Sequence, residues 1–324
     1  MTGETLWTMR RVFVWLTTLI VALPVCSFGQ IGGRPGAFSR LGFGGRGMGM
    51  GNAMAAVRNG DLVGYYNPAL LPWNEERHVS AAFGILSLDR KLNFLEYSQK
   101  LPPNAGLSFG VISAGVDNIE GTDSEGEQTG ALRTSENQAF LSFAVRFPAG
   151  FSLGLNVKLY YYHLYTDINS TTVGLDFGFA YVLAKDLTLA ATVRDVNSKY
   201  KWDTSKLYGL NGESSEEKFP LLFTAAAAYN LPDSLGFVSV EIEKSNASTL
   251  VDRFGLEIPL LNELTVRGGM DRIDLKEKGN GVKPTFGFTV RKGFESWMPV
   301  LTYAYVVEPF STSGMHMISL GAMF

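Results

Sequence analysis

Apolar and polar residues alternate along much of the chain. Six stretches show the pattern most clearly: 141–147, 152–161, 173–183, 253–258, 264–267 and 285–291. In each of them apolar side chains occupy every second position, and polar or small side chains lie between them. Because successive residues of a β-strand point to opposite faces, each stretch predicts a strand with one apolar face and one polar face.

Two fold classes fit this alternation: a soluble antiparallel sandwich and a transmembrane β-barrel. Length separates them, since the predicted strands run for about 10 to 13 residues, enough to cross a bilayer at a tilt, whereas sandwich strands have about 5 or 6. We count about fourteen strands, an even number as in bacterial barrels. They start near residues 78, 91, 105, 136, 151, 172, 186, 218, 235, 250, 262, 283, 296 and 314.

The connections between the predicted strands alternate in length. Tight turns fall at 148–150, 184–186, 232–235, 261–262 and 293–296. Longer loops fall between them, at 117–135, 165–171, 197–217 and 273–282. Short periplasmic turns that alternate with longer outer loops are typical of outer-membrane barrels. The sequence therefore predicts an all-β, transmembrane antiparallel barrel over 78–324.

The end of the chain supports this fold class. Apolar residues alternate back from the terminal aromatic residue, at Ile318, Leu320, Ala322 and Phe324. This pattern resembles the C-terminal signal by which outer-membrane barrels are recognised for insertion. We therefore expect these four residues to serve as a barrel-assembly signal, with the barrel-assembly machinery and outer-membrane lipid as partners.

The first residues resemble a secretory signal peptide. Arg10 and Arg11 precede an apolar run over 12–25, which is shorter than the roughly 20 residues that a spanning helix needs. Ser27 and Gly29 then supply small side chains before a cut at Gln30, so we expect 1–29 to be removed. A retained anchor is the alternative. The single cysteine, Cys26, would leave with the signal, which excludes thiolate metal sites and thiol nucleophiles from the rest of the chain.

Composition excludes two further classes of protein. The net charge is −3 and the pI is about 5.7, so no basic field is present to hold nucleic acid. Mean hydropathy is only +0.07, and no apolar run after the signal approaches 20 residues, which argues against a helical membrane protein. Barrels have weak hydropathy because only alternate residues face lipid.

A glycine-rich segment lies between the signal and the first predicted strand. Gly42, Gly44 and Gly47 satisfy the G-x-G-x-x-G pattern of dinucleotide-binding loops, but an exported chain leaves the compartment that keeps such cofactors. We therefore expect no cofactor. Because a wide barrel must have its lumen filled, and glycine permits close backbone packing, we interpret 30–77 as an N-terminal plug, or hatch, inside the barrel. A mobile periplasmic tail is the alternative.

Several short motifs stand out along the chain. They are Met50-Gly51-Asn52-Ala53, Asn67-Pro68-Ala69, Val157-Lys158-Leu159-Tyr160, Gly174-Leu175-Asp176-Phe177-Gly178 and Phe219-Pro220. In this order they resemble the PorV/PorQ family of outer-membrane proteins, relatives of the FadL-type long-chain fatty-acid transporters. The resemblance implies a fourteen-stranded barrel with an N-terminal hatch. It also implies a hatch motif made of Gly47, Met50, Gly51, Ala53, Asn67, Pro68 and Ala69.

Catalytic and metal-binding patterns are weak, and we expect no enzyme. His78, His163 and His316 have neither metal-ligand spacing nor a G-x-S-x-G partner. The acidic stretch 117–136 could bind calcium, but it lacks the ligand order of a calcium loop, so a solvated outer loop is the preferred interpretation. Six charged residues are predicted to face the lumen and to pair across strands: Asp176, Arg194, Arg253, Glu257, Arg267 and Asp271.

Two functions follow from these patterns. The PorV-like resemblance implies an accessory of type IX-like protein secretion, which receives cargo with a C-terminal signal domain through the hatch and outer loops. The alternative is a FadL-like passive transporter of hydrophobic small molecules, with a strand kink that opens the wall. Glycine in a strand often marks a bulge, so the candidate kinks are Gly110, Gly268 and Gly269. Either function places the chain in the outer membrane of a Gram-negative bacterium, with both termini in the periplasm.

Overall fold

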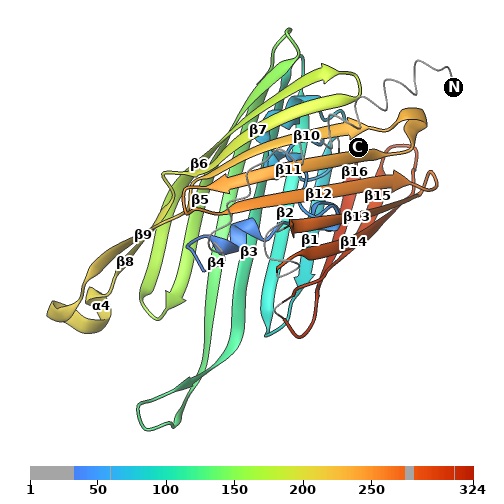
Figure 1. Ribbon diagram of the computed structural model, residues 1–324. Helices are drawn as coiled ribbons and strands as arrows, with labels where there is room; N and C mark the ends of the chain where they lie inside the picture. The colour runs from blue at the N-terminus through green and yellow to red at the C-terminus, as the bar shows by residue number, and fades with distance from the viewer. Residues whose placement is uncertain (1–32, 59, 274–280, 310) are drawn as a thin grey trace.

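Fourteen antiparallel strands close into a barrel in the computed structural model, which describes residues 33–58, 60–273, 281–309 and 311–324 (Figure 1). The barrel strands are β1 (His78–Ile85), β2 (Arg90–Leu101), β3 (Ala105–Thr122), β4 (Gln128–Arg146), β5 (Phe151–Tyr165), β6 (Ile168–Ala184), β7 (Leu187–Val196), β10 (Leu222–Asn230), β11 (Phe237–Ser245), β12 (Leu250–Pro259), β13 (Leu264–Ile273), β14 (Lys283–Arg291), β15 (Met298–Val306) and β16 (Met315–Met323). The predicted fold class and strand number are therefore confirmed.

Barrel closure joins the first strand to the last. β1 pairs with β16 from His78↔Met323 to Ile85↔His316, and every other barrel strand pairs with the next one along the chain. Tight turns lie at one end of the barrel, called here the turn end, and longer connections lie at the other, called the loop end. The start of β1 and the C-terminal residue Phe324 both lie at the turn end, where Arg77 and Phe324 exchange backbone hydrogen bonds.

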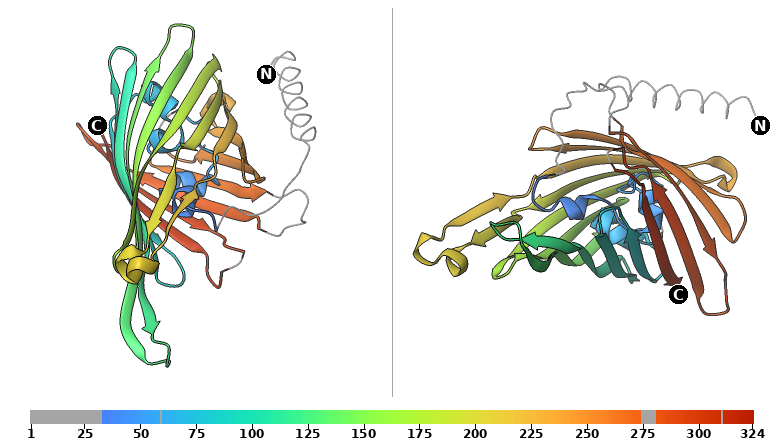
Figure 2. Two further views of the ribbon diagram at one scale, coloured as in Figure 1. Left: turned by 90° about the vertical axis from the view of Figure 1, so that its left-hand side faces the viewer. Right: turned by 90° about the horizontal axis from the view of Figure 1, so that it is seen from below.

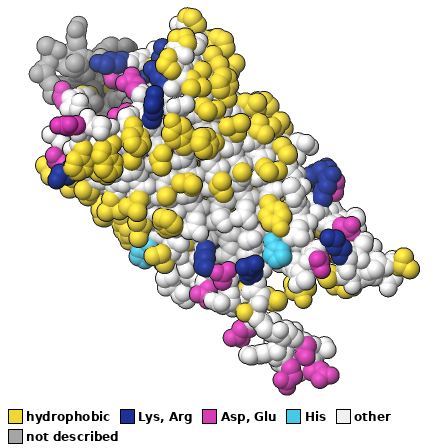
Figure 3. All heavy atoms as spheres, turned by 180° about the vertical axis from the view of Figure 1, so that it is seen from behind, with side chains coloured by type: hydrophobic (Ala, Val, Ile, Leu, Met, Phe, Trp, Pro, Cys, Tyr) yellow, Lys and Arg dark blue, Asp and Glu magenta, His cyan; other side chains and the backbone are white. Residues whose placement is uncertain are grey.

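The apolar face of the strands points outward. On β5, Leu153 and Leu159 are 49% and 48% exposed, whereas Ser152 and Asn156 on the other face of the strand are 0% exposed. Figure 3 shows the resulting apolar surface over the strands. A soluble sandwich would bury its apolar face. Because the apolar residues here point outward and the polar ones inward, the strands form a barrel that faces lipid. Among the residues that the structure describes, no helix has the length and apolar character to cross a membrane.

The connections at the loop end differ from the predicted coil. β4 begins at Gln128 rather than near residue 136, because β3 and β4 continue as a paired hairpin through much of the predicted loop 117–135. The predicted loop 197–217 contains a second hairpin, called here the arm. It consists of β8 (Lys199–Asp203), α4 (Ser205–Tyr208), η3 (Gly209–Asn211) and β9 (Ser214–Lys218), and both hairpins project from the barrel in Figure 1.

The described part of the glycine-rich segment, 33–58 and 60–77, lies within the barrel and is called here the hatch. Its short helices are η1 (Ala37–Arg40), α2 (Gly45–Gly49), α3 (Val63–Tyr66) and η2 (Pro68–Trp73). Figure 2 shows them inside the curve of the strands. Nearly all of their side chains are buried, so the hatch supplies much of the hydrophobic core. The predicted signal peptide, 1–29, lies outside the described residues.

Candidate functional site

The lumen and the hatch that fills it form the candidate site. The hatch turn at Met50 and Gly51 lies directly against the wall at positions that lack a Cβ. A Cβ on Gly269 would lie 2.4 Å from the Gly51 nitrogen, and a Cβ on Gly255 would lie 2.6 Å from the Met50 oxygen. Gly51 itself has a φ of +61°, which L side chains rarely adopt. Glycines on both surfaces therefore let the hatch backbone touch the strands of the wall.

The wall is regular at the glycines that were predicted to kink it. Gly110 pairs with Glu96 and Phe140, and Gly268 and Gly269 pair with β12, all without a register shift. The register shifts of these ladders lie between Val116 and Ile119 and between Gly121 and Thr122 on β3, and between Met270 and Ile273 on β13, directly after Gly269. A role of these glycines in opening the wall stays a prediction, and the structure gives Gly269 a second role, contact with the hatch.

The residues of the predicted hatch motif all lie within the packed hatch. Gly47 leaves room for the Tyr66 ring, and Met50, Gly51 and Ala53 are buried in the turn against the wall. Pro68 begins η2, where its missing N–H is no loss, and Asn67 caps the helix by accepting a 3.0 Å hydrogen bond from the Ala69 amide. The motif residues therefore position the hatch; none of them is placed to perform chemistry.

Asn67 also joins two parts of the molecule. Its Nδ2 donates to the Ala55 carbonyl at 2.9 Å and to the Phe179 carbonyl of β6 at 3.2 Å. Its side chain is 0% exposed. An aspartate at this position would keep the cap but would bring a carboxylate oxygen against two carbonyl oxygens.

We therefore expect Asn67→Asp to lower the free energy of unfolding by about 2–4 kcal/mol. Two hydrogen bonds would be lost, and the carboxylate would repel both carbonyl oxygens. Reversible urea unfolding in lipid vesicles measures this difference. The matched control is Asn169→Asp at the exposed β5–β6 connection, where Oδ1 already acts as the hydrogen-bond partner of His163. Equal effects of the two substitutions would contradict the assigned role of Asn67.

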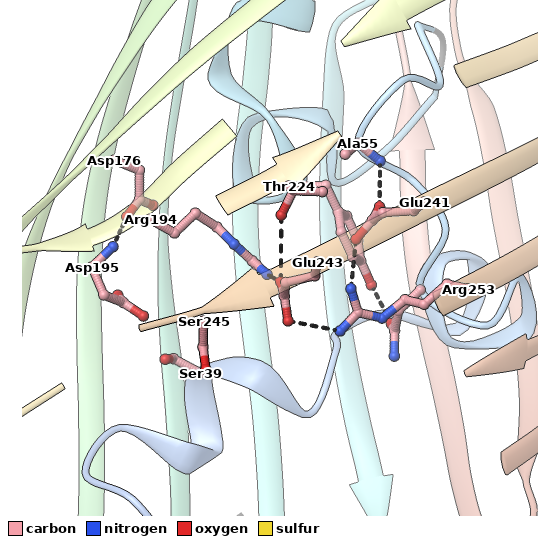
Figure 4. A network of polar contacts seen from close by, with 12 residues as sticks. Ser39, Ala55, Asp176, Arg194, Asp195, Thr224, Glu241, Glu243, Ser245 and Arg253 are labelled. Carbon is pink, nitrogen blue, oxygen red and sulfur yellow. Dashed lines mark hydrogen bonds and ion pairs between the residues drawn. The ribbon is translucent and has the colours of Figure 1, made fainter. Parts of the chain in front are cut away.

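Buried ion pairs line one half of the lumen, from β5 through β13 (Figure 4). At its centre Arg253 donates to Glu241 at 2.6 Å, to Glu243 at 3.1 Å and to Asp271 at 2.8 Å. Arg194 also pairs with Glu243. The cross-strand pairing predicted for the lumen charges is therefore confirmed, including Arg267 with Glu257 and Asp176 with Lys158. We call this half the ionic sector.

Carboxylates of the ionic sector also accept hydrogen bonds from the hatch. Arg46 of α2 makes a two-pronged contact with Glu257, at 2.9 and 3.0 Å. The Ala55 amide donates to Glu241 at 3.2 Å, and Asn52 donates to Asp271 at 3.3 Å. Charge-assisted hydrogen bonds of this kind are stronger than those between neutral groups. The sequence predicted charges in the lumen, but it gave no sign that the hatch shares their partners.

A second charged cluster lies at the loop end of β5–β7. Lys158 contacts Asp176 at 2.7 Å and Asp195 at 3.0 Å, and the Tyr160 hydroxyl donates to Asp195 at 2.7 Å. The ring of Phe219 packs on Tyr160 with centroids 4.9 Å apart. The fold thus brings together residues from three of the separate motifs on which the family resemblance rested.

Aromatic rings connect the arm to the hatch. The chain of ring contacts runs from Trp202 to Tyr200, Phe219, Tyr160 and finally Phe38 of η1, with centroid separations of 5.4, 4.8, 4.9 and 6.3 Å. At the base of the arm, exposed polar contacts also join β8 to β9. A hydrogen bond from Lys199 lowers the pKa of the Glu216 carboxyl, so this carboxylate stays ionised at pH values below the usual carboxylate pKa.

In the other half of the lumen, polar residues such as Ser80, Ser98 and Ser142 face inward near the turn end, and a group of apolar side chains lies toward the loop end. We call this group the apolar sector, and its inward-facing side chains, none more than 4% exposed, are Leu92, Phe94, Ile112, Phe140, Val306, Met315 and Met317. They come from β2, β3, β4, β15 and β16, which are neighbours in the barrel around β1. The hatch ring of Phe43 stacks on Phe94, which stacks on Phe140. The sequence analysis missed this sector; its signal was the break in alternation on β2, where residues 92, 94 and 95 are all apolar.

A polar cavity of about 440 Å³ lies under the hatch at the turn end. The hatch contributes Arg46, Asp61 and Asn74 to its lining, and the wall contributes polar side chains that include His78, Ser80 and Arg267. The lumen therefore has three parts in sequence: an apolar sector toward the loop end, the hatch, and a water-accessible cavity at the turn end.

The histidines and the acidic stretch lie apart from one another. His78 and His316 are at opposite ends of the β1–β16 ladder, and His163 bonds to Asn169 at the loop end. The acidic residues of 117–136 follow the β3–β4 hairpin, where Asp123 accepts from the amides of Glu125 and Glu127. Over the described ranges no group of three or more His, Cys, Asp or Glu side chains is arranged to hold a metal ion.

The residues of the predicted assembly signal end the last strand. Ile318 and Leu320 face outward on β16, 36% and 54% exposed. Ala322 pairs with Val79 of β1, and Phe324, just beyond the strand, is 60% exposed. Recognition of these residues by an assembly machinery stays a prediction.

The fold is shared with solved structures of hydrocarbon channels. The Pseudomonas putida toluene transporter TodX superposes with a TM-score of 0.60 at 13% identity, over 87% of this chain and 96% of that one. The monoaromatic hydrocarbon channel CymD gives 0.59 at 13% identity, over 87% and 97%. A FadL homologue from Pseudomonas aeruginosa gives 0.54 at 11% identity, over 86% and 97%.

No family model and no curated protein matches the sequence. At identities this low the likeness to solved structures establishes the barrel fold with the FadL-like architecture. The narrower resemblance to the PorV/PorQ family stays a prediction.

Proposed function

We propose that this protein is an outer-membrane channel for small hydrophobic molecules, the second of the two functions expected from the sequence. The observation that carries the proposal is the apolar sector of the lumen. A barrel that conducts water and ions has a polar interior throughout. Here part of the inner wall, around Phe94, Ile112 and Phe140, consists of hydrocarbon side chains that favour apolar solutes over polar ones.

The fold likeness supports the same class of substrate. TodX is described as a toluene transporter and CymD as a monoaromatic hydrocarbon channel, and this chain shares their fold over most of its length. The proposal transfers only the chemical class, a small apolar molecule. Which apolar molecule this chain prefers depends on side chains that the fold likeness does not compare.

Passage through the lumen requires the hatch to shift. The hatch packs against both the ionic and the apolar sector, and the aromatic rings of Phe43 and Tyr65 fill the space beside Phe94. We propose that a solute enters at the loop end, occupies the apolar sector while the hatch gives way, and leaves through the turn-end cavity. Since short turns face the periplasm in known barrels, the turn end and the C-terminal residue Phe324 are assigned to the periplasmic side.

The secretion role implied by the PorV/PorQ resemblance stays a prediction. The arm and the β3–β4 hairpin would be its contact surfaces, together with the hatch. Normal surface display of cargo with C-terminal signal domains after deletion of the gene would contradict it. The same deletion strain serves the test of hydrocarbon transport, so the two functions are separated in one background.

Cells that carry the protein are expected to take up radiolabelled toluene several-fold faster than the deletion strain. Phe94→Asp is expected to remove most of this gain, because a charge in the apolar sector disfavours a hydrocarbon by the cost of desolvating it. The matched control is Thr192→Asn, a buried lumen substitution on β7 in the ionic sector that does not line the turn-end cavity. Uptake that is the same with and without the protein would overturn the proposed function.

A further inference from the structure

Glu96 lies where the apolar sector meets the turn-end cavity. On β2 it follows Phe94 of the apolar sector by two positions and points to the same side of the strand. Across the ladder it pairs with Ser80 of β1, which lines the turn-end cavity. A solute that passes from one compartment to the other along this wall therefore has to pass Glu96.

The Glu96 carboxylate holds a strained turn of the hatch. Its Oε2 accepts a 3.0 Å hydrogen bond from the Leu62 amide, and its Oε1 accepts one of 3.0 Å from Ser108 Oγ. Leu62 has a φ of +69°, a left-handed conformation that is costly for a branched side chain. Glu96 is 2% exposed, and it forms no ion pair with any residue in the described part of the chain.

The hatch is attached unequally to the two halves of the barrel. Residues 45–55 are bound to the ionic sector through Arg46, Asn52 and Ala55, as described above, and to β16 through Gly45, whose amide donates to Ser319 at 2.7 Å. Within the described residues, two hydrogen bonds join 62–66 to the wall. One is the Glu96–Leu62 contact, and the other is a 3.3 Å bond from Ser142 to the Gly64 carbonyl.

We propose that Glu96 is the latch of the hatch: its contact with the Leu62 amide keeps 62–66 closed, and its release opens a path from the apolar sector to the turn-end cavity while 45–55 stays attached. When the contact breaks, the left-handed turn at Leu62 relaxes, so the stored strain favours opening. Segment 62–66 then moves away from β2 and β3. This inference rests on the proposed function only for the identity of the transported molecule. The latch itself is tested without a transported solute.

The test measures exposure of a thiol in the moving segment. Val63→Cys and Met48→Cys each place one thiol at a position 1% exposed, the first in 62–66 and the second in the attached part. Cys26 is replaced by serine in both proteins. Glu96→Leu is expected to raise the rate at which a water-soluble maleimide labels the thiol at position 63 by about tenfold to a hundredfold, the effect of leaving the buried Leu62 amide without its acceptor. Labelling at position 48 is expected to stay unchanged.

Glu96→Gln separates the contact from the charge. The amide oxygen can still accept from Leu62 and the amide nitrogen can donate to Ser108, so labelling is expected to stay within about twofold of the parent protein. Melting temperature is not the measure, since removing a buried carboxylate can leave overall stability unchanged or higher. Labelling at position 63 that Glu96→Leu leaves unchanged, or an equal rise at positions 63 and 48, would overturn the latch.

The toluene assay keeps the two proposals distinguishable. Faster labelling together with faster uptake in Glu96→Leu supports both the latch and the channel. Faster labelling with uptake no different from the deletion strain keeps the latch and overturns the hydrocarbon function.

Discussion

Arg253→Met is expected to lower the free energy of unfolding by about 3–5 kcal/mol, the usual cost of removing one member of a buried ion pair. Arg253 is the shared partner of Glu241, Glu243 and Asp271, and all four residues are at most 7% exposed. Methionine fills a similar volume but carries no charge to neutralise the three carboxylates. The loss arises because carboxylates remain desolvated without a cation, and it is measured by reversible urea unfolding in lipid vesicles.

A compensating variant identifies the cause of this loss. Glu243 keeps its contact with Arg194, so the triple variant Arg253→Met/Glu241→Gln/Asp271→Asn removes the two charges that are left unpaired. It is expected to recover at least half of the lost stability. Lys199→Met, which breaks the exposed pair with Glu216 on the arm, should cost at most about 1 kcal/mol. A cost below about 1 kcal/mol for Arg253→Met would show that water reaches this cluster.

Gly269→Ala is expected to displace the hatch, whereas Gly268→Ala is expected to be tolerated. A Cβ at position 269 would lie 2.4 Å from backbone atoms of Met50 and Gly51. Neither the backbone of β13 nor that of the hatch turn can move aside as a flexible side chain could. At position 268 the nearest atom is the Thr285 oxygen at 3.7 Å, an ordinary contact. We expect a loss of about 1–3 kcal/mol or more for the first and a change within about 1 kcal/mol for the second.

Ion conductance in planar bilayers measures the displacement directly. The parent protein and Gly268→Ala are expected to conduct little, because the hatch fills the lumen, while Gly269→Ala is expected to open a measurable potassium chloride conductance. The two glycines are neighbours on one strand, so a role in bending the strand predicts similar effects for both. Similar conductance in the two variants would count against the packing explanation.

The strands could be predicted because their pattern is local. Along β5 and β6 each lipid-facing residue must be apolar whatever its neighbours are, so the period of two appears in the sequence itself. The β3–β4 hairpin was predicted as a loop because beyond the barrel its strands face water on both sides. In this part of the hairpin the backbones of β3 and β4 stay paired, but apolar and polar residues no longer alternate, so the sequence carries no strand signal.

The site could be predicted only in part. The pairing of charges such as Arg267 with Glu257 followed from the cost of an unpaired charge inside a barrel. The sharing of Glu257 with Arg46 did not, because the two residues lie far apart in sequence and meet only when the hatch is inserted. For the same reason Gly269 was interpreted as a kink: from the sequence alone, a glycine that admits another backbone cannot be told from one that bends its own strand.

By itself the amino-acid sequence determined that this protein is an antiparallel barrel of about fourteen strands with a small-residue segment before it, since solvent on one side and lipid on the other impose their demands residue by residue. Tertiary structure alone decided that the lumen has an ionic sector and an apolar sector, and that Glu96 meets Leu62 where the apolar sector joins the turn-end cavity. Those features depend on which strands become neighbours and on how the hatch is seated among them. Contacts between residues distant in sequence leave no periodic trace along the chain.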